Sequence, residues 1–293
     1  MLVYLADAFA PDLPARLAKL AQVTEDKGRL KDVEVVIVRS KTKVTKEYID
    51  GAPKLKMVIR GGVGLDNVDA EYAKKKGIIV KNTPEASSIA VAELTFALML
   101  AVPNHIVAGC NSMRECKWLK KELERTELYG KTLGLVGMGL IATEVAKRAR
   151  AFGMRVAAYR KSGKPSEYAE VKKSLAEVLK EADYISLHTP LTDETHFIIN
   201  KDSISMMKDG AVIVNTARGQ CVVEEDVVAA LKSGKLRGYA TDVYYSDPPE
   251  NSPLAAAPNV VMTPHIGAST EENLNRIGDV IVKLIGEYAK TKK

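Results

Sequence analysis

The sequence is poor in several residue types, and each scarcity excludes a class of protein. Its 293 residues include three cysteines, and an odd count in a chain this long predicts no disulfide framework and favours a reducing compartment. The longest apolar stretch, residues 89–102, falls short of the roughly 20 residues that span a bilayer and contains Glu93. The first residues lack the basic and apolar segments of a secretory signal. We therefore expect a cytoplasmic protein with no membrane partner.

Charge of one sign is not in large excess either. The 43 Lys and Arg residues and the 37 Asp and Glu residues give a net charge of +6, which is mild for this length. Nucleic-acid-binding domains carry a stronger and more clustered basic bias, so we expect no nucleic-acid partner. Hydrophobic residues make up 46% of the chain and charged residues 27%, the balance of an ordinary globular protein of one large or two medium domains.

Short β-branched runs alternate with helical segments along the chain. Three runs in the first part, ending near residues 38, 59 and 80, and six in the second part, from 132–136 to 260–262, are expected to be strands. A long helix is expected over residues 87–113 and a terminal helix over 270–290. This alternation predicts an α/β fold with two doubly wound parallel-sheet domains and a cleft between them.

A glycine-rich turn follows the first strand of the second part. Gly137, Gly139 and Ala142 form the pattern G-x-G-x-x-A, directly before a helical segment. Between a strand and a helix, this pattern binds the pyrophosphate of a dinucleotide at the helix N-terminus. The next strand ends at Arg160 and Lys161, where an acid would select against a 2′-phosphate. We therefore expect NADP(H) to be preferred over NAD(H).

Polar side chains follow several other predicted strands. His188 and His265 each come after a strand, and spacing alone leaves both open as the catalytic base. Arg218 ends another strand, and a guanidinium suits two-point binding of a carboxylate. Asp242 and Asp247 lie around a turn, and a carboxylate beside a histidine fixes its tautomer. An arginine, an acid and a histidine at neighbouring strand ends are suited to hydride transfer to a 2-oxo acid.

Longer motifs resemble the D-isomer-specific 2-hydroxyacid dehydrogenase family along nearly the whole chain. They are GVGLDNVD at 62–69, VAEL at 91–94, GKTLG at 130–134, GMG at 137–139, NTARG at 215–219 and TPHIGAST at 263–270. The resemblance implies a dinucleotide-binding Rossmann domain, residues 99–266, inserted in a flavodoxin-like substrate domain, residues 1–98 plus 267–293. It also implies a homodimer that forms through the long helix.

The resemblance implies roles for individual residues as well. Arg218 would bind the substrate carboxylate, His265 would act as the general acid or base, and Asp247 would be its carboxylate partner. The family usually has Glu where this chain has Asp247, which is one methylene shorter. The expected substrate-binding residues are Arg60, Val63, Gly64, Arg218 and His265. The expected cofactor-binding residues are Thr83, Gly137, Gly139, Leu140, Ile141, Arg160, Lys161, Thr189, Pro190, Thr216, Asp242, Gly267 and Ala268.

The sequence leaves the 2-hydroxy acid open. Arg60 and Lys75 resemble the basic residues near the substrate phosphate of phosphoglycerate dehydrogenases, which favours 3-phosphoglycerate and 3-phosphohydroxypyruvate. The expected use of NADP(H), and the expectation that no regulatory extension is present, instead favour an NADPH-dependent glyoxylate or hydroxypyruvate reductase. A remote alternative is an NAD(H)-sensing binding protein similar to a corepressor. No metal site is expected, because no cluster of His, Cys and Asp has ligand spacing.

Overall fold

The computed structural model describes residues 1–291, so the last two residues of the expected range 267–293 lie outside it. The chain divides into two compact units, Met1–Ser88 together with the segment from Ala268 onward, and Ile89–Gly267. The expected boundary after residue 98 falls inside a helix, whereas the units divide ten residues earlier, at the start of that helix.

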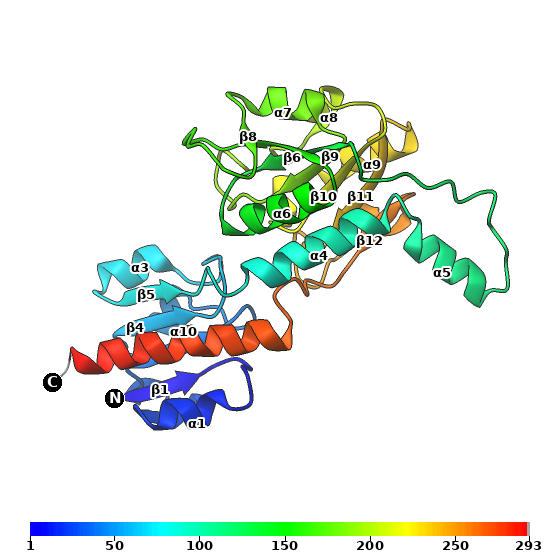
Figure 1. Ribbon diagram of the computed structural model, residues 1–293. Helices are drawn as coiled ribbons and strands as arrows, with labels where there is room; N and C mark the ends of the chain where they lie inside the picture. The colour runs from blue at the N-terminus through cyan, green and yellow to red at the C-terminus, as the bar shows by residue number, and fades with distance from the viewer. Residues whose placement is uncertain (292–293) are drawn as a thin grey trace. The chain divides into compact units, whose positions relative to one another are not determined.

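The first unit is built on a five-stranded parallel sheet with helices on both faces (Figure 1). The strand order is β2-β1-β3-β4-β5, which is the flavodoxin-like 2-1-3-4-5 order. Helix α10 packs beside α1 on one face, and the apolar core there includes Leu13, Ile277 and Ile281. The strands are β1 (Leu2–Leu5), β2 (Gln22–Thr24), β3 (Val35–Val38), β4 (Met57–Arg60) and β5 (Ile79–Asn82). The helices are α1 (Leu13–Ala18), η1 (Lys27–Asp32), α2 (Lys46–Asp50), α3 (Ala70–Lys75) and α10 (Glu271–Lys290).

The second unit contains a seven-stranded parallel sheet in the order β12-β11-β10-β9-β6-β7-β8. Counted from β6, this is the Rossmann order 3-2-1-4-5-6 with one further edge strand, so the predicted fold class is confirmed. The strands are β6 (Thr132–Val136), β7 (Arg155–Tyr159), β8 (Glu170–Val171), β9 (Tyr184–Leu187), β10 (Ala211–Asn215), β11 (Leu236–Thr241) and β12 (Val260–Met262). The helices are α4 (Ser88–Ala101), α5 (Ile106–Arg114), α6 (Leu140–Ala151), α7 (Leu175–Glu181), α8 (Lys201–Ser205), η2 (Gly219–Cys221), α9 (Glu224–Lys232) and η3 (Pro253–Ala256).

Local sequence explains why these segments form. The central strands are runs of β-branched residues, such as VVIV in β3 and AVIVN in β10, that are buried along their whole length. Helix α3 starts at Asp69, whose side chain accepts a hydrogen bond from the backbone of Tyr72, and α10 starts in the same way at Thr270. In the second unit, α4 and α6 cover one face of the sheet, and α7, α8 and α9 cover the other.

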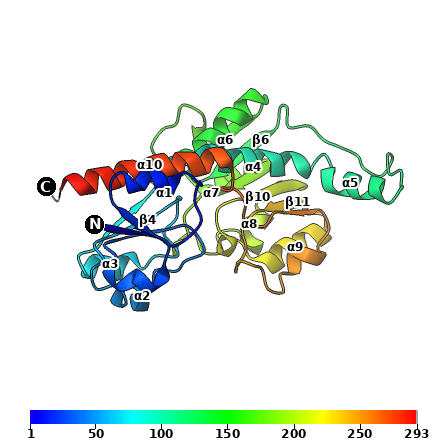
Figure 2. The ribbon, with the colours of Figure 1, turned by 90° about the horizontal axis from the view of Figure 1, so that it is seen from below.

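The predicted helix over residues 87–113 is wrong in one respect, because it is broken. Helix α4 ends at Ala101 and α5 begins at Ile106, with an angle of 65° between them. Pro103 has no N–H and disfavours helical geometry at the residue before it, and His105 then adopts a left-handed conformation with φ of 50°. Helix α5 and the segment after it project from the body of the second unit (Figures 1 and 2).

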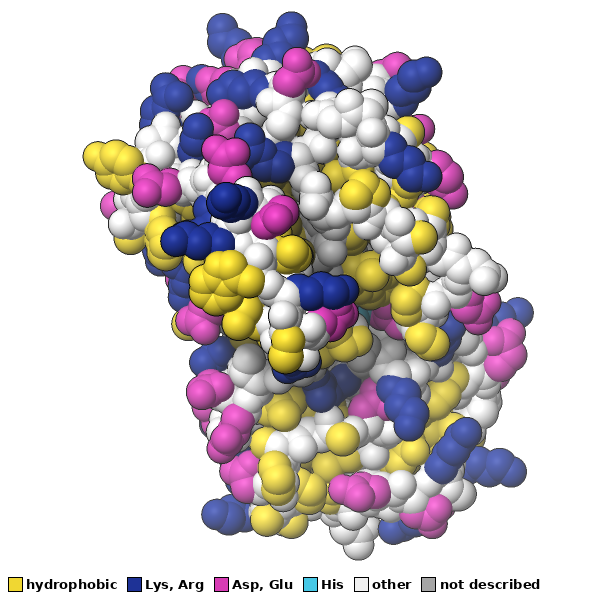
Figure 3. Space-filling view, turned by 90° about the vertical axis from the view of Figure 1, so that its right-hand side faces the viewer, with side chains coloured by type: hydrophobic (Ala, Val, Ile, Leu, Met, Phe, Trp, Pro, Cys, Tyr) yellow, Lys and Arg dark blue, Asp and Glu magenta, His cyan; other side chains and the backbone are white. Residues whose placement is uncertain are grey.

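Three strands were not anticipated from the sequence. β1 starts at the second residue, and β2 and β8 are edge strands of three and two residues with little burial. Within the described part of the chain, no single helix is long and apolar enough to cross a membrane, and the pair α4 and α5 satisfies that test only when taken together across its bend. Charged side chains of both signs are interspersed over the face drawn in Figure 3.

Candidate functional site

The glycine turn after β6 has two glycines with different physical roles. Gly137 has φ of +99°, and a Cβ there would lie 2.4 Å from the carbonyl oxygen of His188, so the packing of the chain requires glycine. Gly139 directly precedes α6, and a Cβ there would have no atom within 4 Å. Ala142 is fully buried between helix and sheet, and its small side chain lets the two pack closely.

The start of α6 is suited to hold a phosphate. No side chain caps this helix, so its first N–H groups, on Leu140 and Ile141 among others, point outward without an intrahelical partner. The turn lies between β6 and β9, where the strand order of the sheet reverses, and this is the place where sheets of this type bind ligands. The residues present therefore fit the pyrophosphate of a dinucleotide.

The end of β7 carries the two cations that the sequence analysis singled out. Lys161 is exposed and forms a hydrogen-bonded ion pair with Glu194, which raises the pKa of its ammonium group. Arg160 is partly buried and forms no ion pair with any residue that the structure describes. Of the two, Arg160 is therefore the one available to a ligand.

His188, at the end of β9, is less suited than His265 to act as the proton donor. The ring of His188 is surrounded by protein, although the residue keeps some contact with solvent, and its Nε2 bonds the hydroxyl of Ser186 at 2.8 Å. Burial lowers the pKa of His188 to about 3, so its imidazole is neutral near pH 7 and is a poor proton donor. Thr189 and Pro190 follow it in the loop, and the carbonyl of Pro190 accepts a hydrogen bond from Thr195.

The turn after β10 is held from within by Asn215. This fully buried side chain donates to the carbonyl of Arg218 at 2.9 Å and accepts from the backbone of Ala217 at 3.0 Å. Thr216, in the same turn, shares a hydrogen bond with the hydroxyl of Thr95 on α4 at 2.9 Å. Asn215 belongs to the NTARG motif, but no pattern in the sequence indicates that its side chain supports the turn.

Gly219, which follows Arg218, packs the turn after β10 against the loop that contains Tyr244. A Cβ at Gly219 would lie 2.2–2.6 Å from backbone atoms of Tyr244, so no larger residue fits without displacing that loop. The guanidinium of Arg218 donates from Nη1 to the carbonyl of Ala217 at 2.6 Å. Arg218 is partly buried and lies at the carboxyl edge of the sheet.

Asp242 fixes the loop that carries His265. Its buried carboxylate accepts three hydrogen bonds, from the hydroxyl of Thr263 and from the backbone N–H groups of Ile266 and Gly267, at 2.6–2.8 Å. Tyr244 holds the same loop from the other side, because its hydroxyl donates to the carbonyl of Thr263 at 2.8 Å. These bonds occupy Asp242, so its position in the structure is that of a support for the loop.

His265 and Asp247 meet although they come from different loops. Nδ1 of His265 bonds a carboxylate oxygen of Asp247, and both side chains are about half exposed. A carboxylate only accepts hydrogen bonds, so Nδ1 carries the proton and Nε2 remains to exchange a proton with a ligand. The aspartate therefore reaches the imidazole despite being one methylene shorter than glutamate.

In the first unit, two arginines flank the glycine pair after β4. The guanidinium of Arg60 folds over Gly62, where a Cβ would lie 1.7 Å from its Nη1. Cγ of Arg39 is 3.5 Å from the Cβ position of Gly61, whereas its Nη1 donates to the carbonyl of Ala8 at 3.4 Å. Asp7 accepts one hydrogen bond from the backbone N–H of Arg39. Burial lowers the pKa of Arg39, and the charge of Asp7 opposes this shift. Arg39 was missed from the sequence because only the fold places β3 beside β4.

The remaining predicted residues of the first unit lie in three places. Val63 is exposed, its carbonyl accepts a hydrogen bond from Asn82, and Gly64 follows it in the loop. Thr83 is buried, and its hydroxyl oxygen has no hydrogen-bond partner within residues 1–291. The carbonyl of Ala268 accepts from Asn273 at 2.6 Å.

Lys75 does not join the basic groups after β4. It lies at the end of α3, which leads into the amino end of β5, whereas Arg60 ends the parallel neighbouring strand β4. Arg60 therefore lies at the carboxyl ends of the strands and Lys75 toward their amino ends, which corrects the expectation from the sequence. Across residues 1–291 there is no group of three or more His, Cys, Asp or Glu side chains able to hold a metal ion.

Comparison with known proteins identifies relatives. The family described as D-isomer specific 2-hydroxyacid dehydrogenase, NAD binding domain, matches residues 96–267. A hydroxypyruvate reductase of Thermotoga maritima is 49% identical over 261 residues, 87% of this chain and 84% of the relative. A D-3-phosphoglycerate dehydrogenase of Methanocaldococcus jannaschii is 46% identical over 261 residues, 88% of this chain, which spans only half of that relative. A crystal structure of D-lactate dehydrogenase from Aquifex aeolicus, complexed with NAD and lactic acid, has a TM-score of 0.87 at 32% identity, covering 99% of this chain and 96% of the other.

Proposed function

Because the chain belongs to the D-isomer-specific 2-hydroxyacid dehydrogenase family, as its motifs predicted, we propose that it transfers a hydride between a nicotinamide dinucleotide and C2 of a small 2-oxo or 2-hydroxy acid. The observation that carries this proposal is the hydrogen bond between His265 and Asp247. It lies at the same edge of the seven-stranded sheet as the glycine turn, because all strands of the sheet are parallel.

Each side chain of the proposed site has a chemical task. When bound, the reduced nicotinamide supplies the hydride that C2 of the 2-oxo acid accepts. His265 gives the proton from Nε2 to the carbonyl oxygen, and the carboxylate of Asp247 stabilises the imidazolium form that donates it. Arg218 binds the substrate carboxylate and stabilises negative charge on the carbonyl oxygen. In the oxidation, His265 takes the proton back. Val63 and Gly64 are proposed to contribute backbone groups to the carboxylate site.

The residues proposed to hold the cofactor surround the turn after β6 and the neighbouring strand ends. Gly139 with the start of α6 would hold the pyrophosphate, and Arg160 would bind the 2′-phosphate of NADP(H). A charge-assisted hydrogen bond contributes about 1.5–3 kcal/mol, or roughly ten- to a hundredfold in affinity. The preference for NADP(H) depends on Arg160, since Lys161 is already paired with Glu194.

A substitution at Arg160 tests the cofactor preference. We expect Arg160→Ser to raise KM for NADPH at least tenfold with little effect on KM for NADH, and Lys161→Ser to change both less. A wild-type enzyme with a clear preference for NADH would contradict the proposal.

For the substrate we propose 3-phosphoglycerate and 3-phosphohydroxypyruvate, because the guanidinium of Arg60 lies over the glycine pair after β4 and a guanidinium suits a phosphate. The alternative is a glyoxylate or hydroxypyruvate reductase, favoured by the match over 84% of a hydroxypyruvate reductase. A panel of 2-oxo acids with NADH and NADPH distinguishes the two. We expect Arg60→Ser to reduce kcat/KM for the phosphorylated substrate alone, with Lys75→Ser as the control, and equal loss on hydroxypyruvate would contradict the phosphate role.

We also propose that the chain forms a homodimer through α5 and the segment after it. Large apolar side chains there are exposed, namely Ile106, Val107, Met113 and Trp118, with 46–73% of their surface open to solvent. Isolated proteins rarely expose such a contiguous set, and a second copy would bury it. Light scattering on the wild type and on Trp118→Ser with Ile106→Ser tests this. A monomeric wild type would contradict it.

A further inference from the structure

The loop that carries Asp247 is exposed, but hydrogen bonds to Glu224, at the start of α9, hold both of its ends. Residues 245–251 lie on the surface between β11 and η3, and Asp247 has the short side chain of an aspartate. A carboxylate with so little reach contacts His265 only if the loop backbone is held in place. Contacts on both sides of the loop supply that restraint, and they converge on Glu224, the first residue of α9.

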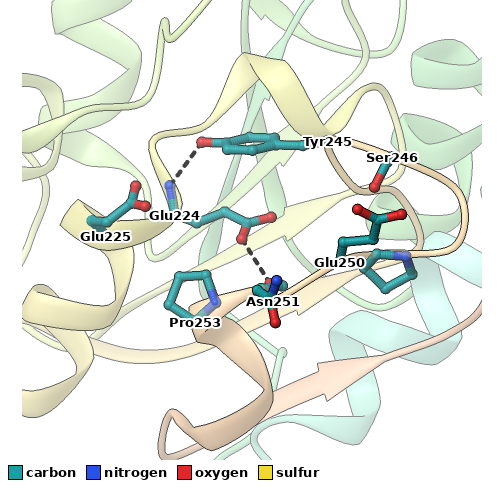
Figure 4. A pocket seen from close by; sticks show the side chains of 9 residues that line it. Glu224, Glu225, Tyr245, Ser246, Glu250, Asn251 and Pro253 are labelled. Atoms are coloured by element: carbon teal, nitrogen blue, oxygen red, sulfur yellow. Dashed lines mark hydrogen bonds between the residues drawn. The ribbon is translucent and has the colours of Figure 1, made fainter.

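On the entry side of the loop, Tyr245 provides the cap that α9 otherwise lacks. The residue before the helix, Val223, has no side chain that can cap it. The hydroxyl of Tyr245 accepts a hydrogen bond from the backbone N–H of Glu224 at 3.2 Å (Figure 4). It also donates to the carbonyl of Val222 at 2.8 Å. Gln220 adds a bond to the carbonyl of Tyr245 at 2.9 Å. The start of α9 and the start of the loop are therefore fixed together.

On the exit side, the carboxylate of Glu224 holds Ser252. Its oxygen accepts the hydroxyl hydrogen of Ser252 at 2.6 Å, and that hydroxyl also accepts from the backbone of Leu254. Glu224 is only 3% exposed, and it lines a shallow surface hollow together with residues of the loop. Glu225, also facing this hollow, makes no hydrogen bond to the loop (Figure 4).

We propose that Glu224, Tyr245 and Ser252 are positioning residues that hold the Asp247 loop where its carboxylate fixes the proton of His265 on Nδ1. This inference rests on the proposed dehydrogenase function, because it deepens the role of the same site. In this proposal the three residues act only through Asp247.

The tautomer of His265 tests this inference without any turnover. Long-range proton–nitrogen NMR of histidine-labelled protein, at alkaline pH, separates the two neutral tautomers, and the chain has only four histidines to assign. We expect Nδ1–H to dominate in the wild type and Nε2–H in Asp247→Ala. Ser252→Ala and Glu224→Ala should move His265 at least halfway toward Asp247→Ala. Glu224→Gln should restore the wild-type tautomer because its amide oxygen still accepts from Ser252, and the matched control Glu225→Ala should leave it unchanged.

Kinetics supply a second readout. Glu224→Ala and Ser252→Ala should lower kcat for reduction about tenfold, a part of the 10²–10⁴-fold that a placed acid–base group contributes, and leave KM for the cofactor unchanged. Should Glu224→Ala fail to fold, Ser252→Ala, which deletes one hydroxyl, decides the question. A wild-type tautomer in Ser252→Ala, an equal shift in Glu225→Ala, or no shift in Asp247→Ala would overturn the proposal. If the wild type reduces no 2-oxo acid, the proposed function fails while the tautomer result still decides the positioning role.

Discussion

Two places at the same edge of the seven-stranded sheet are built in opposite ways. The glycine turn after β6 is complete within residues 137–142, and its hydrogen-bonding groups are those of one helix start. The group around His265 comes from three separate loops, at residues 215–219, 242–247 and 263–267. Side-chain hydrogen bonds cross between the last two, and Gly219 packs the first against the backbone of Tyr244. The comparison teaches that a ligand cradle made of backbone needs only a local pattern, whereas a proton-transfer group needs the assembled sheet.

Glycine appears in both places for related steric reasons. Gly137 lies against the carbonyl of His188, and Gly219 lies against the backbone of Tyr244, so each allows two loops to meet. Gly139 is different, because the space beside it is open within the protein. The predictions that follow separate the two kinds of construction.

The largest expected effect is at the assembled site. His265→Asn should lower kcat for reduction by about 10²–10⁴-fold, because the proton donor is lost, with little change in KM for the cofactor. His196→Asn, a substitution of an exposed histidine in a turn, is the control. Steady-state rates with a reduced cofactor and a panel of 2-oxo acids measure the effect, and full activity of His265→Asn would exclude it as the acid.

The second prediction contrasts two glycines of the local turn. Gly137→Ala should destabilise the fold by about 1–3 kcal/mol, because its φ is strained for alanine and its Cβ meets the His188 carbonyl. Gly139→Ala should change the stability by at most about 1 kcal/mol, yet weaken cofactor binding, since the methyl enters the open space. Urea unfolding and cofactor titration measure the two quantities, and equal losses of stability would contradict this division.

His188, whose carbonyl lies against Gly137, should make the free energy of unfolding depend on pH in the acid range. Its folded pKa of about 3 lies below the ordinary value of 6.5, so the unfolded chain binds the proton first and the protein loses stability as the pH falls below about 6.5. The loss should reach about 2 kcal/mol at pH 4.5, allowing for the partial solvent contact of the residue. Unfolding at pH 7.5 and pH 4.5 should show this loss in the wild type and a smaller one in His188→Gln. The same loss in both proteins would refute the assignment.

The smallest effect concerns Glu224. Burial and the neighbouring Glu225 raise its pKa, although the bond from Ser252 opposes them. Its stability contribution is therefore present at low pH and is lost as the pH rises through the raised pKa. Relative to the wild type, Glu224→Gln should be more stable at pH 7.5 than at pH 4, by less than about 1 kcal/mol. Thermal unfolding at both pH values is the measurement, and a relative gain at the lower pH instead would reverse the sign.

Residue patterns predicted the parts of the protein in which neighbours in the chain are neighbours in space. Alternating strands and helices gave the α/β class, and the pattern of Gly137 and Gly139 lies at the start of α6 as expected. The strand β1 escaped prediction because it begins at the second residue, before any turn that would mark its start. Pro103 lies just after a long apolar run whose helical period continues across it, so the period alone does not mark the break.

Motifs spread along the chain identified the family by resemblance. The alternation of strands and helices and the spacing of glycines, which act over a few residues, predicted the fold class and the backbone cradle. The folded chain was needed to show that the ring of His188 is buried and neutral, that His265 reaches Asp247, and that Lys75 and Arg60 lie toward opposite ends of the strands. The physical reason is that burial, and hydrogen bonds between loops, depend on which strands become neighbours. In a parallel sheet those neighbours are set by crossover connections across long stretches of chain.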